Sequence, residues 1–241
     1  MRCVSKAVIT CGGYATRFLP ITKAIPKEML PIGDRPAIHY ILDELESAGV
    51  TDVLILVGRG RECLLNYLDK NYEIDDVLQK TGNKIQTNFF ENLNIYYRRV
   101  PMPNGVCDCV MHARSFVGAD NFVLCYCDDI FFNGNPTQEL LTKTAENDGR
   151  SGIIAAKVKE PKKYGVIFDG KITEKPKKPK SNLAAVGRYL LSPKFFTIES
   201  DDMIEKLNSL DFMTIETESL RFDIGSKEGY FEALKHYFTS S

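Results

Sequence analysis

The sequence predicts an α/β fold: a mostly parallel mixed sheet flanked by helices, with a smaller α+β lobe in the C-terminal third. Apolar runs alternate with amphipathic helical patterns over the first two-thirds, which implies right-handed strand–helix–strand units. The runs are apolar almost throughout, as expected of parallel strands that are buried on both faces. Because ligands of such sheets bind beyond the carboxyl ends of the strands, we expect the functional residues there.

The first elements show this alternation clearly. Lys6–Thr10 is a short apolar run that leads into a glycine-containing loop, and it predicts the first strand. Pro36–Ala48 places apolar residues at three- and four-residue spacing, which predicts an amphipathic helix that Gly49 ends. Asp52–Val57 is the next apolar run and predicts the second strand.

Five further elements continue the pattern. The helical ones are expected at Arg61–Leu68 and at Pro136–Asn147, whose leading proline suits a first helical turn. Strands are expected at Asn94–Arg99, Asn121–Cys127 and Ser151–Lys157.

The character of the sequence changes at about residue 158. Proline and lysine become frequent up to Lys180, and short strands are expected at Lys171–Glu174 and Leu183–Leu191. The last element is a helix at Ser226–Phe238, whose aromatic stripe predicts packing against the core. No linker is evident, so we expect a single domain over 1–241, with one part at 1–157 and another at 158–241.

The charge balance excludes some classes of function. Lysine and arginine total 31 and aspartate and glutamate total 32, a net charge of −1. A dedicated nucleic-acid binder would carry a basic face, and no apolar stretch approaches the roughly 20 residues of a membrane span. Met1–Gly13 lacks the pattern of a secretion signal. We expect a cytoplasmic protein with no nucleic-acid or membrane partner.

The 7 cysteines are expected to be reduced thiols, because their number is odd and the chain has an ample core. The pairs Cys107/Cys109 and Cys125/Cys127 lack the two-residue spacing of common zinc sites, which favours packing roles. The histidines have no evident nucleophile or acid partner. Neither a structural zinc nor a catalytic triad is therefore expected.

Two neighbouring segments carry the chemistry. In the loop after the first strand, Gly12 and Gly13 permit close approach of backbone N–H groups to a phosphate or a base. The stretch Thr16–Pro31 follows, and its prolines forbid a regular helix. This stiff segment holds Arg17 and Lys27 near one strand end, an arrangement that suits a polyphosphate.

The run Thr16–Pro31 resembles the signature of the bacterial-type UTP–glucose-1-phosphate uridylyltransferases, within the wider sugar-1-phosphate nucleotidyltransferases. The resemblance continues in order along the chain, through Glu160–Val166, Glu174–Lys177, Ser181–Tyr189 and Arg221–Tyr230. It implies a Rossmann-like nucleotidyltransferase fold. The implied reaction joins a nucleoside triphosphate, UTP in this family, to glucose 1-phosphate and releases pyrophosphate. Because the sugar phosphate supplies the nucleophile, the protein has to neutralise repulsion and align the attack.

The resemblance also implies site residues. Arg17, Lys27 and Asp128 would be catalytic, and Asp128 with Asp223 would bind Mg²⁺. The residues expected to bind the nucleotide, in the part at 1–157, are Cys11, Gly12, Gly13, Thr16, Arg17, Gly105 and Asp108, the last because it offers acceptor oxygens to the base. Those implied for the sugar phosphate, in the part at 158–241 that also holds the C-terminal helix, are Gly165, Glu174 and Lys175.

The chain departs from the family pattern in several places. Ala15 replaces a glycine of the loop, which predicts a shifted loop or a strained φ angle. The family reads Ala where this chain has Cys11, and Gly-Asp-Asp where it has Cys127-Asp128-Asp129.

Two longer segments also differ. In the base-reading stretch Val100–Cys109, Val100 replaces a glutamine and only Gly105 is clearly kept, while Ile198–Leu220 is shorter than usual. The base, the sugar and homo-oligomer formation therefore stay open. The alternatives are a thymidylyl- or N-acetylhexosamine-1-phosphate uridylyl-transferase, or a binding protein without turnover.

Overall fold

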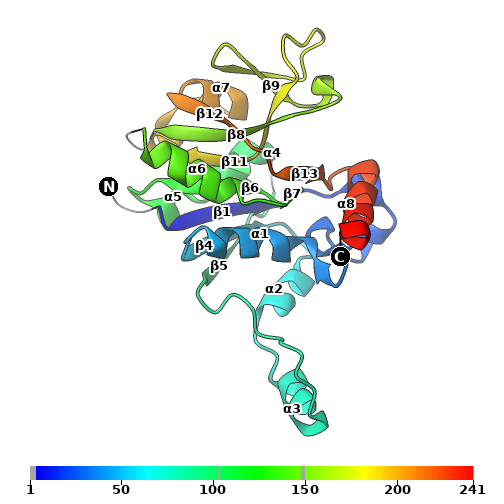
Figure 1. Cartoon of the computed structure of the whole chain (residues 1–241). Helices are drawn as coiled ribbons and strands as arrows, with labels where there is room; N and C mark the ends of the chain where they lie inside the picture. The colour runs from blue at the N-terminus through cyan, green and yellow to red at the C-terminus, as the bar shows by residue number, and fades with distance from the viewer. Residues whose placement is uncertain (1–3, 103, 148–149, 241) are drawn as a thin grey trace.

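The computed structural model describes residues 4–102, 104–147 and 150–240 (Figure 1). Cys3 of the predicted thiols and Pro103 of the Val100–Cys109 stretch lie outside these ranges. The centre of the molecule is a nine-stranded sheet in which the order β10-β9-β11-β6-β1-β4-β5 is continued by β8 on β11 and by β12 on β8. Its strands are β1 (Lys6–Cys11), β4 (Asp52–Val57), β5 (Asn94–Arg99), β6 (Phe122–Tyr126), β8 (Ser151–Lys157), β9 (Gly165–Phe168), β10 (Lys171–Glu174), β11 (Leu183–Leu191) and β12 (Phe212–Glu216).

The N-terminal half of this sheet is parallel. β1 pairs with β4 on one side and with β6 on the other, and β4 pairs with β5, all in parallel. β11 then runs antiparallel to β6 and to β8, and β12 returns parallel to β8. The mixed, mostly parallel sheet expected from the sequence is confirmed, and each predicted strand matches an observed one to within a few residues.

Helices cover both faces of the sheet, because successive strand residues point into different cores. On β1, Ala7 and Ile9 pack in the core that contains α1, whereas Val8 packs in the core that contains α4. The helices are α1 (Ala37–Ser47), α2 (Glu62–Leu68), α3 (Tyr72–Thr81), α4 (Gly105–Met111), α5 (Arg114–Val117), α6 (Pro136–Ala145), α7 (Met203–Asn208) and α8 (Lys227–Ser240). Helix α3 was not predicted, and it projects away from the rest of the molecule (Figure 1).

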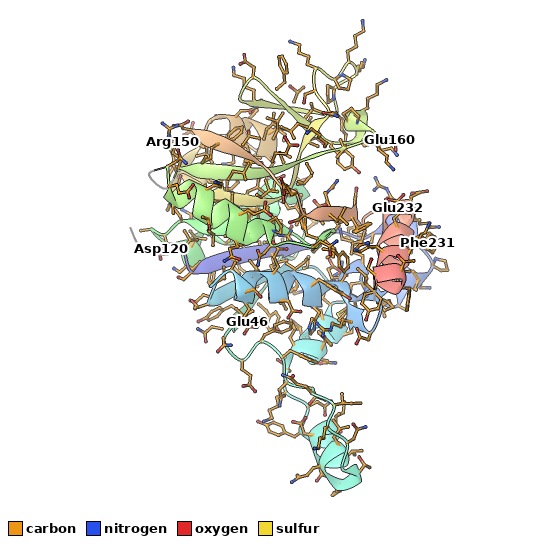
Figure 2. The ribbon with its side chains drawn as sticks, in the orientation of Figure 1. Glu46, Asp120, Arg150, Glu160, Phe231 and Glu232 are labelled. Carbon is orange, nitrogen blue, oxygen red and sulfur yellow. The ribbon has the colours of Figure 1, made fainter. Side chains whose placement is uncertain are left out.

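The C-terminal helix α8 packs against the body of the molecule with only part of its aromatic stripe. Tyr230 and Tyr237 pack on the core, as the pattern predicts. Phe231 and Phe238 are instead exposed, and Phe231 lies on the outer side of the helix (Figure 2).

The segment predicted as a small lobe continues the main sheet through the long strand β11. The edge of β11 that pairs with β6 through Arg188–Leu191 also pairs with β9, through Ala184. Between these two pairings the register of β11 with β8 shifts, and Gly187 adopts a φ of +20°. The β9–β10 hairpin therefore leaves the sheet beside the end of β6, and a space opens between them.

Two short ladders shape the rim of this space. β7 (Asp129–Phe132) pairs with β13 (Leu220–Asp223), which sets Asp223 opposite Asp129 although they are far apart in the chain. β2 (Pro31–Ile32) pairs with β3 (Arg35–Pro36). Before β2, the proline-rich segment forms three single 3₁₀ turns, η1 (Thr16–Phe18), η2 (Ile21–Lys23) and η3 (Lys27–Met29). The expected absence of a regular helix here is confirmed.

Across the described ranges, no helix combines the length and the apolar character needed to cross a membrane. The six described cysteines are free.

Candidate active site

A cavity of about 640 Å³ lies at the carboxyl ends of β1 and β6, where β9 and β11 diverge from them. It gathers ten of the residues that the sequence singled out, from Gly12 near the N-terminus to Asp223 near the C-terminus. These are Gly12, Gly13, Arg17, Lys27, Gly105, Asp128, Gly165, Glu174, Lys175 and Asp223. One cavity therefore brings together the five charged residues predicted for catalysis, for the metal and for holding the sugar phosphate with Lys175, namely Arg17, Lys27, Asp128, Lys175 and Asp223.

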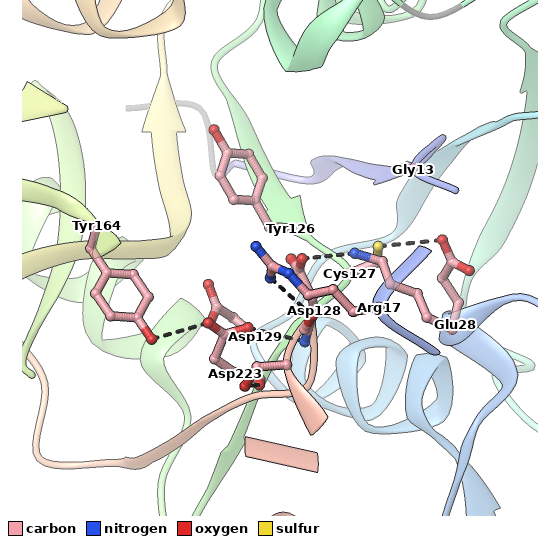
Figure 3. Close-up of polar contacts among 12 residues, drawn as sticks. Gly13, Arg17, Glu28, Tyr126, Cys127, Asp128, Asp129, Tyr164 and Asp223 are labelled. Carbon is pink, nitrogen blue, oxygen red and sulfur yellow. Dashed lines mark hydrogen bonds and ion pairs between the residues drawn. The ribbon is translucent and has the colours of Figure 1, made fainter. Parts of the chain in front are cut away.

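A close ion pair forms the floor of the cavity. Lys27 on η3 places its Nζ 2.7 Å from Oδ2 of Asp128, which lies in the turn between β6 and β7 (Figure 3). Burial by itself would raise the pKa of Asp128, but the charges of Lys27 and Arg221 hold it below its ordinary value. Burial opposes the charge of Lys27, yet Cys127, Asp128 and Glu28 outweigh it and raise the pKa of this lysine. Asp128 is therefore ionised at neutral pH.

Asp128 and Asp223 face each other across Gly225. A Cβ atom on Gly225 would lie 2.9 Å from Oδ2 of Asp128 and 3.0 Å from Oδ1 of Asp223, so only glycine fits between them. Asp223 is held by a hydrogen bond of 3.0 Å from the Tyr164 hydroxyl to Oδ2 (Figure 3). Two carboxylates around one point are a donor set that suits a hard divalent cation, with phosphate oxygens and water as the other ligands.

The neighbouring carboxylate Asp129 points to a different partner. Its Oδ1 accepts a hydrogen bond from Nε of Arg221 at 2.5 Å. Burial raises the pKa of Asp129 to about 6, Asp128 and Asp223 add to that shift, and Arg221 opposes it. A Cβ atom on Gly187 would lie 2.5 Å from Oδ2 of Asp129, so the glycine at the irregular point of β11 leaves room for this side chain. Asp129 thus fixes Arg221 beside the acid pair of Asp128 and Asp223.

A buried arginine holds the turn that carries Asp128 and Asp129. Arg188 on β11 is fully buried and makes two hydrogen bonds to the Glu44 carboxylate on α1, at 2.8 and 2.7 Å. It also donates to the backbone carbonyls of Tyr126 and Asp129, at 3.3 and 3.1 Å. This positioning role was not predicted from the sequence. The available indication was a single charged residue inside the otherwise apolar strand 183–191.

The loop after β1 is held by a second arginine. Arg61 donates to the backbone carbonyl of Gly13 at 2.6 Å and to that of Cys11 at 3.3 Å. Arg17, at the start of the proline-rich segment, is exposed and donates to the Gly225 carbonyl at 3.1 Å. The guanidinium of Arg17 therefore lies over the acid pair and is free to meet an anionic ligand from the solvent side (Figure 3).

Ala15 adopts the left-handed conformation, with φ 48° and ψ 45°, so the strained φ expected from the sequence is confirmed. Replacing Ala15 with glycine should raise the free energy of unfolding by about 0.5–1 kcal/mol, because glycine removes the left-handed penalty but loses more entropy on folding. Urea denaturation measures this. Ala48 has φ −82°, so Ala48→Gly, the matched control, should not stabilise; equal stabilisation by both would contradict the strain.

The opposite side of the cavity comes from the β9–β10 hairpin. Glu174 ends β10, and Lys175 follows it with φ 41°. The Lys175 backbone N–H donates to the Tyr164 carbonyl at 3.0 Å, while its Nζ lies 3.0 Å from the Glu174 carboxylate. Both side chains are about half exposed, so this pair can rearrange around a ligand.

Three residues predicted to bind the nucleotide do not line the cavity. Cys11 is buried at the end of β1, and Thr16 is exposed on η1. Asp108 instead accepts a hydrogen bond from the Asn104 backbone N–H at 3.0 Å, because it lies in the first turn of α4. Val100 occupies the position at which the family has a base-reading glutamine. Its side chain is buried in the core, so it does not face a ligand in the cavity.

Residues of α4 and of the segment at the start of α7 line the remaining wall. Val106 and Cys109 of α4 and Met203 and Ile204 of α7 give it a largely apolar character. This wall was not predicted from the sequence, because the prolines and the asparagine that precede α4 indicate a loop.

Comparison with known proteins agrees with this geometry. The family model described as nucleotidyl transferase matches residues 6–238. A UTP–glucose-1-phosphate uridylyltransferase 2 of Staphylococcus saprophyticus is 35% identical over 271 residues, with 98% of this chain and 93% of that protein covered.

Solved structures are similar as well. A UTP-bound UDP-glucose pyrophosphorylase from Acinetobacter baumannii has a TM-score of 0.89 at 28% identity, with 99% of this chain and 94% of that chain covered. A UDP-glucose pyrophosphorylase in complex with UDP-glucose has a TM-score of 0.85 at 28% identity, with coverage of 99% and 100%. With the match spanning nearly its whole length and the charged residues of the motifs gathered in one cavity, the chain belongs to the nucleotidyl transferase family.

Proposed function

We propose that the protein transfers the uridylyl group of UTP to glucose 1-phosphate, giving UDP-glucose and pyrophosphate. The relatives named for this activity cover nearly the whole chain. The observation that carries the proposal is the single cavity lined by Arg17, Lys27, Asp128, Lys175 and Asp223. Cations from both parts of the chain and a pair of acids surround a space large enough for two phosphorylated ligands.

The reaction needs no protein nucleophile. A phosphate oxygen of glucose 1-phosphate attacks the α-phosphorus of UTP, a new P–O bond forms, and the bond to pyrophosphate breaks. Lys27, fixed by Asp128 at 2.7 Å, would meet the α-phosphate from the cavity floor. Arg17 would steady the departing pyrophosphate, and Lys175 with Glu174 would hold the sugar phosphate. A charge that is fixed in advance, as Lys27 is by Asp128, stabilises a phosphoryl-transfer transition state without reorganisation.

Asp128 and Asp223 would hold Mg²⁺, because their donor atoms are all carboxylate oxygens and they face each other across Gly225. The ion would neutralise charge on the phosphate oxygens. In this arrangement residues 1–157 would hold the nucleotide, and the β9–β10 hairpin of the part at 158–241 would hold the sugar phosphate.

The test is pyrophosphate release with Mg²⁺, crossing UTP, dTTP, ATP and GTP with glucose 1-phosphate and N-acetylglucosamine 1-phosphate. The highest kcat/KM is expected for UTP with glucose 1-phosphate. Preference for dTTP or for the N-acetylated sugar would contradict the assigned substrates. Nucleotide binding without release from any pair would show a binding protein instead of an enzyme.

Lys175→Ala should raise KM for glucose 1-phosphate by about tenfold or more, because a hydrogen bond to a charged group is worth about 1.5–3 kcal/mol. KM for UTP should change little, since Lys175 belongs to the hairpin side of the cavity. Steady-state kinetics with each substrate varied in turn checks this. Lys178→Ala is the matched control, because Lys178 is exposed in the same basic run and does not line the cavity. An unchanged KM for the sugar phosphate would count against the role.

A further inference from the structure

Directly behind the Lys27–Asp128 pair lies a cluster of two thiols and a carboxylate that the proposed reaction does not use. Cys11 ends β1, Cys127 follows β6, and Glu28 lies on η3. The two sulfur atoms and one carboxylate oxygen of Glu28 all lie within 4.8 Å of one another. Because β1 and β6 are neighbouring parallel strands, their ends bring the two cysteines together.

All three side chains are buried, with exposed fractions of 0% for Cys11 and Glu28 and 3% for Cys127. Cys127 donates a long hydrogen bond of 3.5 Å from Sγ to Oε1 of Glu28 (Figure 3). Cys127 also lines the active-site cavity. The cluster is therefore shielded from bulk water but can be reached from the cavity.

One oxygen of this cluster has no donor. Oε2 of Glu28 accepts no hydrogen bond from any residue that the structure describes. The nearest cation, Nε of Arg61, is 3.6 Å away and donates instead to the Cys11 carbonyl at 3.3 Å. Leaving a buried acceptor unpaired costs about 1–3 kcal/mol, and a bound cation would remove that cost.

We propose that Cys11, Glu28 and Cys127 bind a thiophilic divalent cation such as Zn²⁺, at a site distinct from the oxygen site of Asp128 and Asp223. Two sulfurs and a carboxylate oxygen select zinc-like ions, whereas Mg²⁺ requires oxygen ligands. Binding forms two metal–sulfur bonds and one metal–oxygen bond and releases the two thiol protons to solvent. A water molecule from the cavity would complete a four-coordinate ion.

The charges around the cluster suit such an ion. Two thiolates, one carboxylate and a divalent cation leave one net negative charge. Lys27 and Arg61 flank the cluster and compensate it. In addition, neither cysteine belongs to the motif that the chain otherwise resembles, which has Ala and Gly at these places. The two departures from the motif meet at the same point in space.

An ion at this cluster would act on the neighbouring ion pair, because Cys127 precedes Asp128 and Glu28 follows Lys27 in the chain. Drawing Cys127 and Glu28 toward a metal would move the Lys27–Asp128 pair. Occupancy is therefore expected to lower turnover, a consequence that rests on the proposed function. Binding itself does not rest on it.

The test uses Cd²⁺ as the probe, on the full chain kept reduced with a phosphine. Cd²⁺ bound to thiolates gives an ultraviolet charge-transfer band, and equilibrium dialysis gives the stoichiometry. One tightly bound Cd²⁺ per chain with a two-thiolate band is expected. Cys11→Ala and Cys127→Ala should each lose at least about half of the band, in proportion to the thiolates removed, and Glu28→Gln should weaken binding by about tenfold or more.

Cys125→Ala is the matched control. Cys125 is also fully buried near the end of β6 but lies outside the cluster, so this variant should keep the wild-type band. Circular dichroism checks the fold of each variant, and if Glu28→Gln does not fold, the cysteine variants decide. An unchanged band in Cys11→Ala/Cys127→Ala, or no band in the wild-type chain at stoichiometric Cd²⁺, would overturn the site. Because absorption needs no turnover, a chain that binds Cd²⁺ but releases no pyrophosphate would contradict only the proposed function.

Discussion

Asparagine in place of Asp128 is expected to lower kcat by about 10²–10³-fold or more, the loss that follows removal of one prearranged electrostatic group. The amide is nearly isosteric, so it keeps the turn between β6 and β7. It removes the negative charge that pairs with Lys27 at 2.7 Å and that would face a divalent ion across Gly225. Initial rates of pyrophosphate release at saturating UTP and glucose 1-phosphate, with Mg²⁺ varied, measure the effect.

Asp76→Asn provides the matched control, because Asp76 lies on the projecting helix α3 and is exposed. It should keep wild-type rates and Mg²⁺ dependence. Circular dichroism and the unfolding midpoint of Asp128→Asn should show an intact fold. Near-normal turnover by this variant would mean that Asp128 is not a metal ligand.

Breaking the buried pair of Arg188 and Glu44 is expected to lower the free energy of unfolding by about 3–5 kcal/mol. Arg188→Met keeps an unbranched apolar stem but removes the guanidinium, which leaves the Glu44 carboxylate, 8% exposed, without its bidentate partner. The carbonyls of Tyr126 and Asp129 also lose their donor. Denaturation in urea, followed by circular dichroism, gives the change in free energy.

An exposed ion pair supplies the comparison. Lys157 lies 2.6 Å from Glu216, but the two side chains are 66% and 48% exposed. Lys157→Met should therefore change stability by less than about 1 kcal/mol. If Arg188→Met were no more destabilising than Lys157→Met, the buried pair would not hold the turn that carries Asp128. A combined Arg188→Met/Glu44→Leu variant should recover part of the loss, because no buried charge then lacks a partner.

Seven of the nine strands of the sheet were predictable because they are short and are set apart by turns or helical patterns, whereas β9 and β12 were not predicted. Asp52–Val57 and Asn94–Arg99 match β4 and β5 residue for residue. Helix α4 was missed because Pro101, Asn104 and Gly105 indicate a loop. It forms because Cys107, Cys109 and Val110 are buried in the core beneath the sheet. Tertiary burial outweighed the local preference.

The charged residues of the site were predictable from their motifs, but the pairs among them were not. The ion pair of Lys27 with Asp128 joins residues 101 positions apart, and Asp129 meets Arg221 across 92. Such pairs depend on strand order and on the β7–β13 ladder, which local patterns do not encode. The same reason explains the cluster of Cys11, Glu28 and Cys127, since only the adjacency of β1 and β6 brings the two cysteines together.

A crystal structure of the chain with UDP-glucose and Mg²⁺ would test the proposed site most directly. We expect the glucosyl group beside Glu174 and Lys175, the diphosphate over the Lys27–Asp128 ion pair, and the ion shared by Asp128 and Asp223. The uracil would then lie toward the part of the wall that α4 forms. A ligand bound outside this cavity, or a sugar placed against α4 with the base at the β9–β10 hairpin, would contradict it.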